Sequence, residues 1–326
     1  MKKKLTAYFY LQGVFIPVSR CVKVIKIDQG FPELMTATFL WFTVYIITYA
    51  GYAASRVIKN VSTEPGVLAV TSVDDELFVL LRRDDNQVAV HSIDDYQLLR
   101  HLNVPEFEPD DFSDMASCVR HRCLYLSDND NRCIVRYDLV SGATSKWSVP
   151  GKPCGLSVTP SCNLLVTCWL WGEPDKLVEL SADSGQCVRE VALQSEIKCP
   201  LHSVQLTTGQ LVVCHGLVFR ALHRVCVVGD DGKVTRSYGG QFGSHIGQLN
   251  GPCHLAVDKD SQFIFVADQW NATIVLLSPT LEFVRYVIEG LTGIRGLHFH
   301  QATRRLFVSQ SCGGGVTVIQ LQTSCI

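Results

Sequence analysis

Three histidines are the residues of this sequence that are best placed to do chemistry. His202, His254 and His298 each lie near the start of a predicted strand. If these strands approached a common axis, the three imidazoles could converge there and bind a metal ion such as Zn²⁺. Their register drifts from copy to copy, however, and no axial Asp or Glu accompanies them. We therefore expect these histidines to be structural and the chain to bind no metal.

Other catalytic patterns are weaker still. Cys118 and Cys123 are separated by four residues, but they stand on strands whose directions diverge, so we expect no zinc site there. The glycine-rich run Ser311–Val316 lies between two predicted strands and not before a helix, which is typical of a turn. The sequence contains no GxSxG motif, no phosphate-binding glycine loop and no HExxH motif. It therefore predicts no enzyme and no cofactor.

Aromatic and basic side chains in predicted loops form a second set of candidates. Trp, Phe and Arg are frequent anchors of protein interfaces, and aromatic residues outside strands are not needed to pack the sheets. We expect a protein partner to bind a face that contains Arg82, Arg83, Arg132, Trp169, Trp171, Phe219, Arg220, Phe242, His245 and Trp270. An alternative interpretation, in which Trp169 and Trp171 pack on neighbouring loops, remains open.

Two Asp–Asn pairs occupy equivalent turns. Asp128 and Asn131 form one pair, and Asp268 and Asn271 form the other. Short side chains with a carbonyl oxygen can accept backbone N–H groups at a turn, so we expect structural turns and not ligand contacts. Asn271 also begins the sequon Asn271-Ala272-Thr273, which would carry a glycan only if this part of the chain were lumenal.

The elements that position these residues recur along the chain. Each copy contains an apolar strand, a short turn, a second apolar strand and one or two further strands. The fourth residues of the successive second strands are Val79, Leu126, Val166, Val213, Val266 and Val308. This spacing of roughly 40 to 50 residues is the period of a propeller blade. The sequence therefore predicts an all-β protein, a six-bladed β-propeller over residues 56–322.

The last copy lacks a fourth strand. It stops after its third strand, Val316–Leu321, whereas the first copy is preceded by the strand-like run Arg56–Val61. A ring has no free edges only when its ends are joined. We therefore predict that Val57–Val61 supplies the outer strand of the last blade.

One copy carries a family signature. In Pro252–Leu277 the string P-x-H-L-A-V-D is followed by FVAD and an N-x-x-I pattern, which resembles the NHL repeat; Tyr125–Asp138 matches it in part. The resemblance implies a propeller similar to the C-terminal module of tripartite-motif (TRIM) NHL proteins. That family usually carries a RING finger, a B-box and a coiled coil upstream, and none is present here. Ubiquitin-ligase activity is therefore not expected of this chain alone.

Charge and cysteine content narrow the function further. Residues 1–60 carry eight Lys or Arg and two Asp or Glu, so 21 of the 29 basic and 29 of the 31 acidic residues lie in the remainder. An acidic body disfavours binding to RNA, although an RNA-binding NHL module remains an alternative. The 14 cysteines are scattered and not paired, which favours free thiols in a reducing, cytoplasmic compartment.

The N-terminal region, residues 1–54, is a leader without a recognisable motif. Within it, the uncharged stretch 34–55 is long enough to be a transmembrane or signal segment. Two readings therefore remain. The first is a non-catalytic, protein-binding propeller, which could recruit a target to a separate ubiquitin ligase. The second is a membrane-tethered propeller in the lumen or outside the cell, either receptor-like or a metalloenzyme similar to propeller lyases or lactonases.

Overall fold

The computed structural model describes residues 7–11, 14–18, 52–61, 66–82, 87–170, 172–216, 222–311 and 315–323. The chain divides into two compact units, of which the first comprises Met1–Gly51 and Cys325–Ile326 and the second comprises Tyr52–Ser324. Within the first unit, β1 (Ala7–Leu11) and β2 (Val14–Val18) pair as an antiparallel hairpin. The second unit contains the predicted ring.

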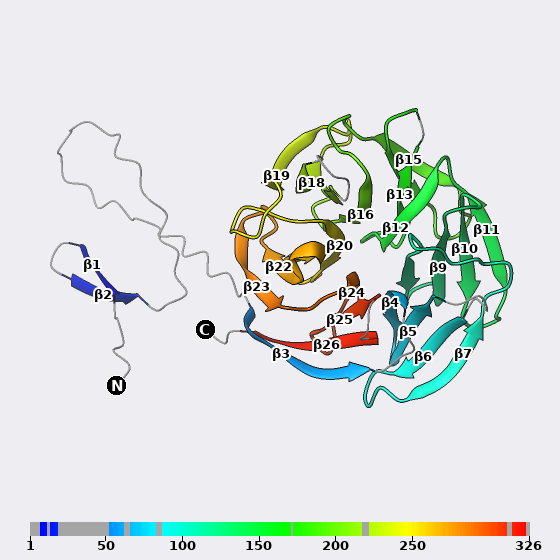
Figure 1. The fold of residues 1–326 in the computed structure, drawn as a ribbon, viewed down its shortest axis with the longest axis horizontal. Coiled ribbons are helices and arrows are strands. Elements are labelled where there is room, and N and C mark those ends of the chain that lie inside the picture. The colour runs from blue at the N-terminus through cyan, green and yellow to red at the C-terminus, as the bar shows by residue number, and fades with distance from the viewer. Residues whose placement is uncertain are drawn as a thin grey trace, which may run out of the picture. The chain divides into compact units, whose positions relative to one another are not determined.

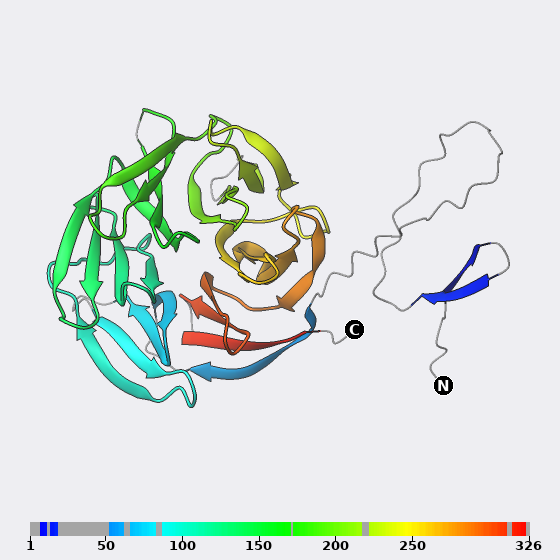
Figure 2. The same ribbon diagram turned by 180° about the vertical axis from the view of Figure 1, so that it is seen from behind.

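The ring consists of six four-stranded antiparallel sheets, which Figure 1 and the reverse view in Figure 2 show as blades around a common axis. Blade 1 consists of β4 (Val67–Val73), β5 (Glu76–Leu81), β6 (Gln87–Ser92) and β7 (Leu98–Asn103). Blade 2 consists of β8 (Met115–Cys118), β9 (Cys123–Asp128), β10 (Cys133–Asp138) and β11 (Thr144–Ser148). Blade 3 consists of β12 (Lys152–Val158), β13 (Leu164–Trp169), β14 (Lys176–Leu180) and β15 (Cys187–Ala192). Blade 4 consists of β16 (Pro200–Gln205), β17 (Leu211–His215), β18 (His223–Val228) and β19 (Val234–Gly240). Blade 5 consists of β20 (Pro252–Val257), β21 (Ile264–Asp268), β22 (Thr273–Leu277) and β23 (Phe283–Glu289), with a short 3₁₀ helix η1 (Gln269–Asn271) between β21 and β22. Blade 6 consists of β24 (Ile294–His300), β25 (Arg305–Gln310), β26 (Gly315–Thr323) and β3 (Tyr52–Val61). The predicted six-bladed propeller is confirmed.

Burial explains why the second strands dominate the sequence pattern. A second strand such as β9 is buried along its whole length, because neighbouring blades cover both of its faces. An outer strand such as β7 is mostly exposed. Apolar clusters fill the space between consecutive blades, where for example Phe265 of blade 5 stacks on Phe299 of blade 6 with 5.2 Å between ring centroids. The core therefore lies between the blades.

The predicted ring closure is confirmed. β3 pairs antiparallel with β26 as the outer strand of blade 6, from Val61 opposite Val316 to Tyr52 opposite Thr323. The strand is longer than predicted, so the last residues of the apolar stretch 34–55 belong to the blade. The rest of that stretch lies outside the described residues. Within the described part of the chain, no helix has the length and apolarity needed to cross a membrane.

Every hairpin between a first and a second strand closes in the same way. Each contains one residue with a left-handed backbone, with φ between 44° and 85°. These residues are Asp74, Arg122, Cys162, Gly209, Gln262 and Arg304. A left-handed residue at the end of a short loop returns the chain into the twist of an antiparallel pair. Residues from all six hairpins line one cavity, so the hairpins lie on one face of the ring. The loops after the second and fourth strands lie on the other face, which we call the loop face.

Serine hydroxyls join consecutive blades near the axis. Ser127 accepts the Asp114 N–H at 2.7 Å and donates to the Cys154 carbonyl of blade 3 at 3.2 Å. Ser309 likewise accepts the Gly296 N–H at 2.8 Å and donates to the Leu68 carbonyl of blade 1 at 3.3 Å. Both serines are fully buried, so each hydroxyl satisfies backbone groups that water cannot reach.

Candidate functional site

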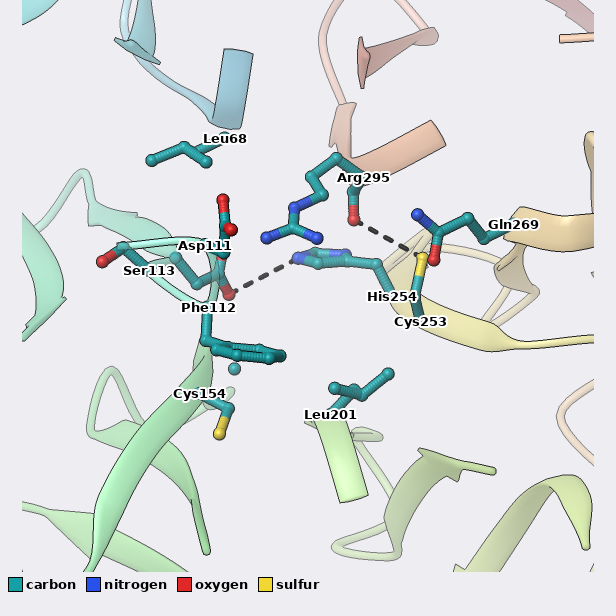
Figure 3. Close-up of a pocket in the computed structure, with 12 residues that line it drawn as sticks. Leu68, Asp111, Phe112, Ser113, Cys154, Leu201, Cys253, His254, Gln269 and Arg295 are labelled. Atoms are coloured by element: carbon teal, nitrogen blue, oxygen red, sulfur yellow. Dashed lines mark hydrogen bonds and ion pairs between the residues drawn. The ribbon is translucent and has the colours of Figure 1, made fainter. Parts of the chain in front are cut away.

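The axis of the ring holds a carboxylate surrounded by histidines. Asp114, directly before β8, accepts the Leu156 N–H of blade 3 through Oδ2 at 2.8 Å. The same oxygen lies 3.5 Å from His254 Nε2 of blade 5 and 3.7 Å from His202 Nε2 of blade 4. His254 also lines a small pocket on the loop face, and Figure 3 shows it with Phe112, Gln269 and Arg295, which line the same pocket. One carboxylate thus connects four blades.

This axial acid contradicts the sequence analysis, which found no Asp or Glu beside the histidines. Asp114 lies opposite Ser127, the fifth residue of its second strand, and His202 and His254 lie opposite the corresponding residues Cys214 and Ala267. Aligning the copies on that residue would have brought the three together. His298 is two residues further along its strand, and its Nε2 pairs with Ser72 Oγ at 2.6 Å instead.

The donor chemistry of this cluster is that of a hydrogen-bonded network. Asp114, His202 and His254 place potential ligand atoms within 4.8 Å of one another. The two imidazoles stack, however, with 3.7 Å between centroids and 28° between planes, so their nitrogen lone pairs do not converge on one point. The Leu297 N–H also points at His254 Nδ1 at 3.3 Å, which leaves the ring proton on Nε2, facing the carboxylate. These residues do not fit a metal centre well.

Burial sets the charge states of the cluster. Desolvation, followed by the neighbouring His254, lowers the pKa of His202 to about 3, so this ring is neutral at pH 7. Burial acts to raise the pKa of Asp114, but His254, His202 and the Leu156 amide outweigh it and hold that pKa below its usual value. The axis therefore carries an ionised carboxylate that accepts N–H groups from its neighbours.

The predicted partner-binding residues divide into three groups. Phe242 and Trp270 are exposed, by 68% and 51%, and both lie against the buried His223, with ring centroids 6.1 Å and 5.8 Å away. The exposed Ile246 belongs to the same loop as Phe242, and the exposed Leu222 precedes His223. We call Leu222, Phe242, Ile246 and Trp270 the aromatic patch.

The second group is anchored in the ring or carries charge. Trp169 is half-buried; its indole N–H donates to the Pro200 carbonyl at 2.6 Å, and its ring meets Phe112 edge-on at 4.9 Å. It packs on neighbouring loops, as the alternative interpretation proposed. Arg82 is exposed and forms an ion pair with Asp111.

Arg132 and His245 are exposed on the loop face, and Arg132 has a left-handed backbone with φ of 52°. The third group cannot be placed: Arg83, Trp171, Phe219 and Arg220 lie outside the described residues.

The two Asp–Asn turns differ in what they hold. Asn131 donates to Asp128 through its backbone N–H at 3.1 Å and through its side chain, so this pair closes its own turn. Asp268 instead accepts the Asn250 N–H at 2.6 Å, and Asn271 Nδ2 donates both to Asp268 and to the Gly243 carbonyl, each at 2.7 Å. The second pair therefore fixes the loop that carries Phe242 and Ile246.

A larger cavity opens on the hairpin face. It has a volume of about 910 Å³ and is lined by the first strands and by the hairpins that follow them. Its polar lining includes Ser117, Cys118, Cys162, His298 and His300. Burial lowers the pKa of His298 to about 3, so its imidazole is neutral at pH 7.

Comparison with known proteins supports the fold alone. No protein-family model matches the sequence, and no curated protein matches it. Among solved structures, a streptogramin B lyase superimposes with a TM-score of 0.57 at 13% identity, covering 82% of this chain and 97% of the lyase. A catalytically inactive virginiamycin B lyase from Staphylococcus aureus, solved with quinupristin, has a TM-score of 0.56 at 12% identity, covering 82% and 88%.

A different propeller is equally similar. The Cps50 (Swd1) β-propeller domain from Myceliophteria thermophila superimposes with a TM-score of 0.55 at 11% identity, covering 82% of this chain and 99% of that domain. At such identities the likeness extends to the ring and not to the site chemistry, because one fold hosts many functions. The NHL type of the repeat stays a prediction from the sequence.

Proposed function

We propose that this chain is a non-catalytic, protein-binding propeller whose aromatic patch holds an apolar segment of a protein partner. The observation that carries the proposal is that Phe242 and Trp270 are both exposed and both lie beside the same buried ring, that of His223. Propeller folds often serve as interaction scaffolds, and loops on a rigid scaffold are where binding residues collect. A few residues carry most of the binding energy at such interfaces, and aromatic side chains are enriched among interface residues.

The support beneath the patch is rigid. The backbone N–H of Gly251 donates to His223 Nδ1 at 2.8 Å, and the backbone N–H of Trp270 donates to the Asn250 carbonyl at 3.0 Å. Gly251 also lies under the indole, because a Cβ at this position would come within 2.9 Å of the Trp270 ring. Together with the Asp268–Asn271 turn, these contacts hold the aromatic rings before a partner arrives, which lowers the entropic cost of binding.

The remaining features support a protein ligand in a reducing compartment. The acidic balance of the ring disfavours RNA, and the cysteines within the described residues are free thiols, as in cytoplasmic proteins. Recruitment of a target to a separate ubiquitin ligase would follow from the NHL resemblance of Pro252–Leu277. That part of the proposal rests on the resemblance only.

The test compares two double variants of the full chain as baits in a cell extract. Phe242→Ala with Trp270→Ala removes the patch, whereas Leu98→Ala with Leu99→Ala removes two residues of similar exposure from the outer strand β7. Proteins captured by the wild type and the β7 variant but lost from the patch variant are the expected result. Equal capture by all three baits, with both variants melting within a few degrees of the wild type, would overturn the proposal.

A further inference from the structure

A cysteine, a histidine and an aspartate form a chain of contacts on the hairpin face. Cys118, the last residue of β8, places Sγ 3.2 Å from Nδ1 of His121 in the following turn. Nε2 of the same imidazole lies 3.1 Å from Oδ1 of Asp183, which belongs to a turn of blade 3. The histidine is mostly covered, whereas the aspartate is 84% exposed. The arrangement therefore crosses from one blade to the next.

The direction of these contacts assigns the protons. An ionised Asp183 accepts a hydrogen bond, so the ring proton of His121 lies on Nε2 and Nδ1 carries the lone pair. Nδ1 then accepts the S–H of Cys118, which makes His121 a base for this thiol. Asp183 stabilises the imidazolium that forms when the proton moves, in the same way that an acid orients the histidine of a nucleophilic cysteine.

Burial opposes ionisation of the Cys118 thiol, whereas neighbouring backbone N–H groups favour it. Burial raises the pKa of the Cys118 thiol, while the backbone N–H groups of His121 and Arg120 act to lower it. The thiol is therefore protonated at rest, and transfer of its proton to His121 produces a thiolate that two amide groups stabilise. A thiolate is the reactive form of cysteine.

A second thiol is positioned beside the first. Cys162, at the tip of the hairpin between β12 and β13, packs against the apolar cluster that contains Cys118, and like burial it acts to raise the pKa of the Cys118 thiol. Both cysteines line the cavity of about 910 Å³, so a small solute can reach them from the hairpin face. Because Cys162 belongs to blade 3, a bond between the two sulfurs would join blades 2 and 3.

We propose that Cys118 and Cys162 form a peroxide-reactive thiol pair, in which His121 activates Cys118 and Cys162 resolves the product. His121 Nδ1 takes the Cys118 proton, and the thiolate attacks one oxygen of a hydroperoxide such as H₂O₂. The O–O bond breaks, the departing hydroxide takes the proton from His121 as water, and Cys118 becomes a sulfenic acid. The Cys162 thiol then attacks the Cys118 sulfur, which releases a second water and leaves a disulfide. Two electrons pass from the two thiols to the peroxide.

The rest of the ring provides internal comparisons. Cys226 also has an imidazole nearby, with Sγ 3.6 Å from His215 Nε2, but both residues are fully buried and neither lines the large cavity. Cys187 is exposed, and no hydrogen bond from its thiol to an imidazole occurs within the described part of the ring. Cys118 is itself only 2% exposed, so its place in the cavity wall distinguishes it from Cys226. We expect Cys226 to be protected because it does not line that cavity, and Cys187 to react slowly because it lacks a base.

The experiment treats the full chain with a small molar excess of H₂O₂ and maps every thiol by mass spectrometry. We expect a peptide linked through Cys118 and Cys162, with a mass lower by two hydrogens, to appear before oxidation of Cys187 or Cys226. In Cys162→Ser, Cys118 should stop at the sulfenic acid, which dimedone captures. In His121→Gln, which removes the base, the same product should form about tenfold more slowly or worse.

Two outcomes would overturn the proposal. One is a folded protein in which Cys187 is oxidised first and Cys118 stays reduced. The other is a sulfenic acid at Cys118 in the wild type that never links to Cys162. Cys187→Ser serves as the matched control, because it removes an exposed thiol and should leave the rate of linkage unchanged. Circular dichroism of each variant verifies that the ring is folded before peroxide is added.

Discussion

Asp114 Oδ2 and His254 Nε2 lie 3.5 Å apart on the axis of the ring, although they belong to the second and fifth blades. Most contacts in a propeller join consecutive blades, so an interaction across the axis is of a different kind. The same carboxylate accepts the Leu156 N–H of blade 3 at 2.8 Å and lies 3.7 Å from His202 Nε2 of blade 4. It therefore connects blade 2 with blades 3, 4 and 5.

Replacing Asp114 with Ala should therefore destabilise the whole ring. The substitution leaves the Leu156 N–H and the His254 Nε2–H without their acceptor, whereas His202 Nε2 keeps its contact with the Leu156 carbonyl at 3.0 Å. Removing one member of such a buried network costs about 3 kcal/mol or more. Urea unfolding followed by circular dichroism measures the loss. Asp111→Ala is the control, because Asp111 is exposed and its ion pair with Arg82 should contribute less than about 1 kcal/mol. Equal losses in the two variants would argue against the axial role.

A single added carbon at Gly155 should separate two neighbouring blades. A Cβ there would come within 2.3 Å of the Leu201 carbonyl oxygen and 2.6 Å of the His202 Cα, and both of these are backbone atoms of blade 4 that cannot move aside easily. We expect Gly155→Ala to cost about 3 kcal/mol or more in unfolding free energy.

The matched control for this prediction is Gly209→Ala. A Cβ at Gly209 meets nothing within 4 Å, but its φ of +85° favours glycine, so the cost should be only about 1 kcal/mol. Thermal melts of both variants measure the difference. A Gly155→Ala protein that melts no lower than Gly209→Ala would show that the first strands of blades 3 and 4 are further apart than described.

Loss of β3 should open the ring. Among the described residues, β3 is the strand that pairs with the outer edge of β26, and Val61 at its end is buried in the apolar cluster shared with blade 1. A chain that begins at residue 63 should lose cooperative unfolding or melt well below the full chain. A chain that begins at residue 52 should retain the transition of the ring. If both truncated chains melted alike, closure by β3 would contribute nothing measurable.

Asp268 should make the stability of the loop face depend on pH. Burial raises its pKa to about 7, although the Asn250 N–H and the Asn271 side chain act to lower it. The folded state therefore binds a proton more tightly than the unfolded state, whose Asp titrates near pH 4. The contribution of this proton is complete below pH 4 and is lost as the pH rises to 7, by as much as about 4 kcal/mol.

The measurement is urea unfolding of the wild type and of Asp268→Asn between pH 4 and 8. The difference between the two proteins should change with pH in this window and stay constant above it. The Asp128→Asn variant, which changes the aspartate of the equivalent turn in blade 2, is unfolded in the same way, and its pH dependence is compared with that of Asp268→Asn. A difference for Asp268→Asn that is constant from pH 4 to 8 would mean that the carboxyl is already ionised at pH 4.

The sequence predicted the ring well because the ring depends on local patterns. Second strands such as Ile264–Asp268 are buried on both faces and read as apolar runs at a regular spacing, and the missing fourth strand of the last copy points directly to Val57–Val61. The site was harder to predict. Asp114 ends a long acidic loop, and only the ladder register shows that it lies opposite Ser127, at the place where other copies carry histidine.

Contacts between blades left no signal in the sequence. His121 and Asp183 are far apart along the chain, and nothing in their neighbours indicates that two hairpin ends meet. Trp169 and Trp270 show the same limit. Trp169 ends a second strand and Trp270 follows one, but the Trp169 indole reaches the Pro200 carbonyl of the next blade, whereas Trp270 stands over Gly251 and stays exposed. Which aromatic residue remains accessible depends on the neighbouring loop.

The strand pairing that closes the ring also determines how the ring would respond to force. Tyr52 and Thr323 pair at one end of blade 6, so the first and last described residues of the ring lie beside each other. Tension applied through these two positions would load the hydrogen bonds between β3 and β26 one after another, like a zipper, and not all together in shear. We expect the ring to yield at a low force, with blade 6 opening first and the other blades following as the edge is exposed.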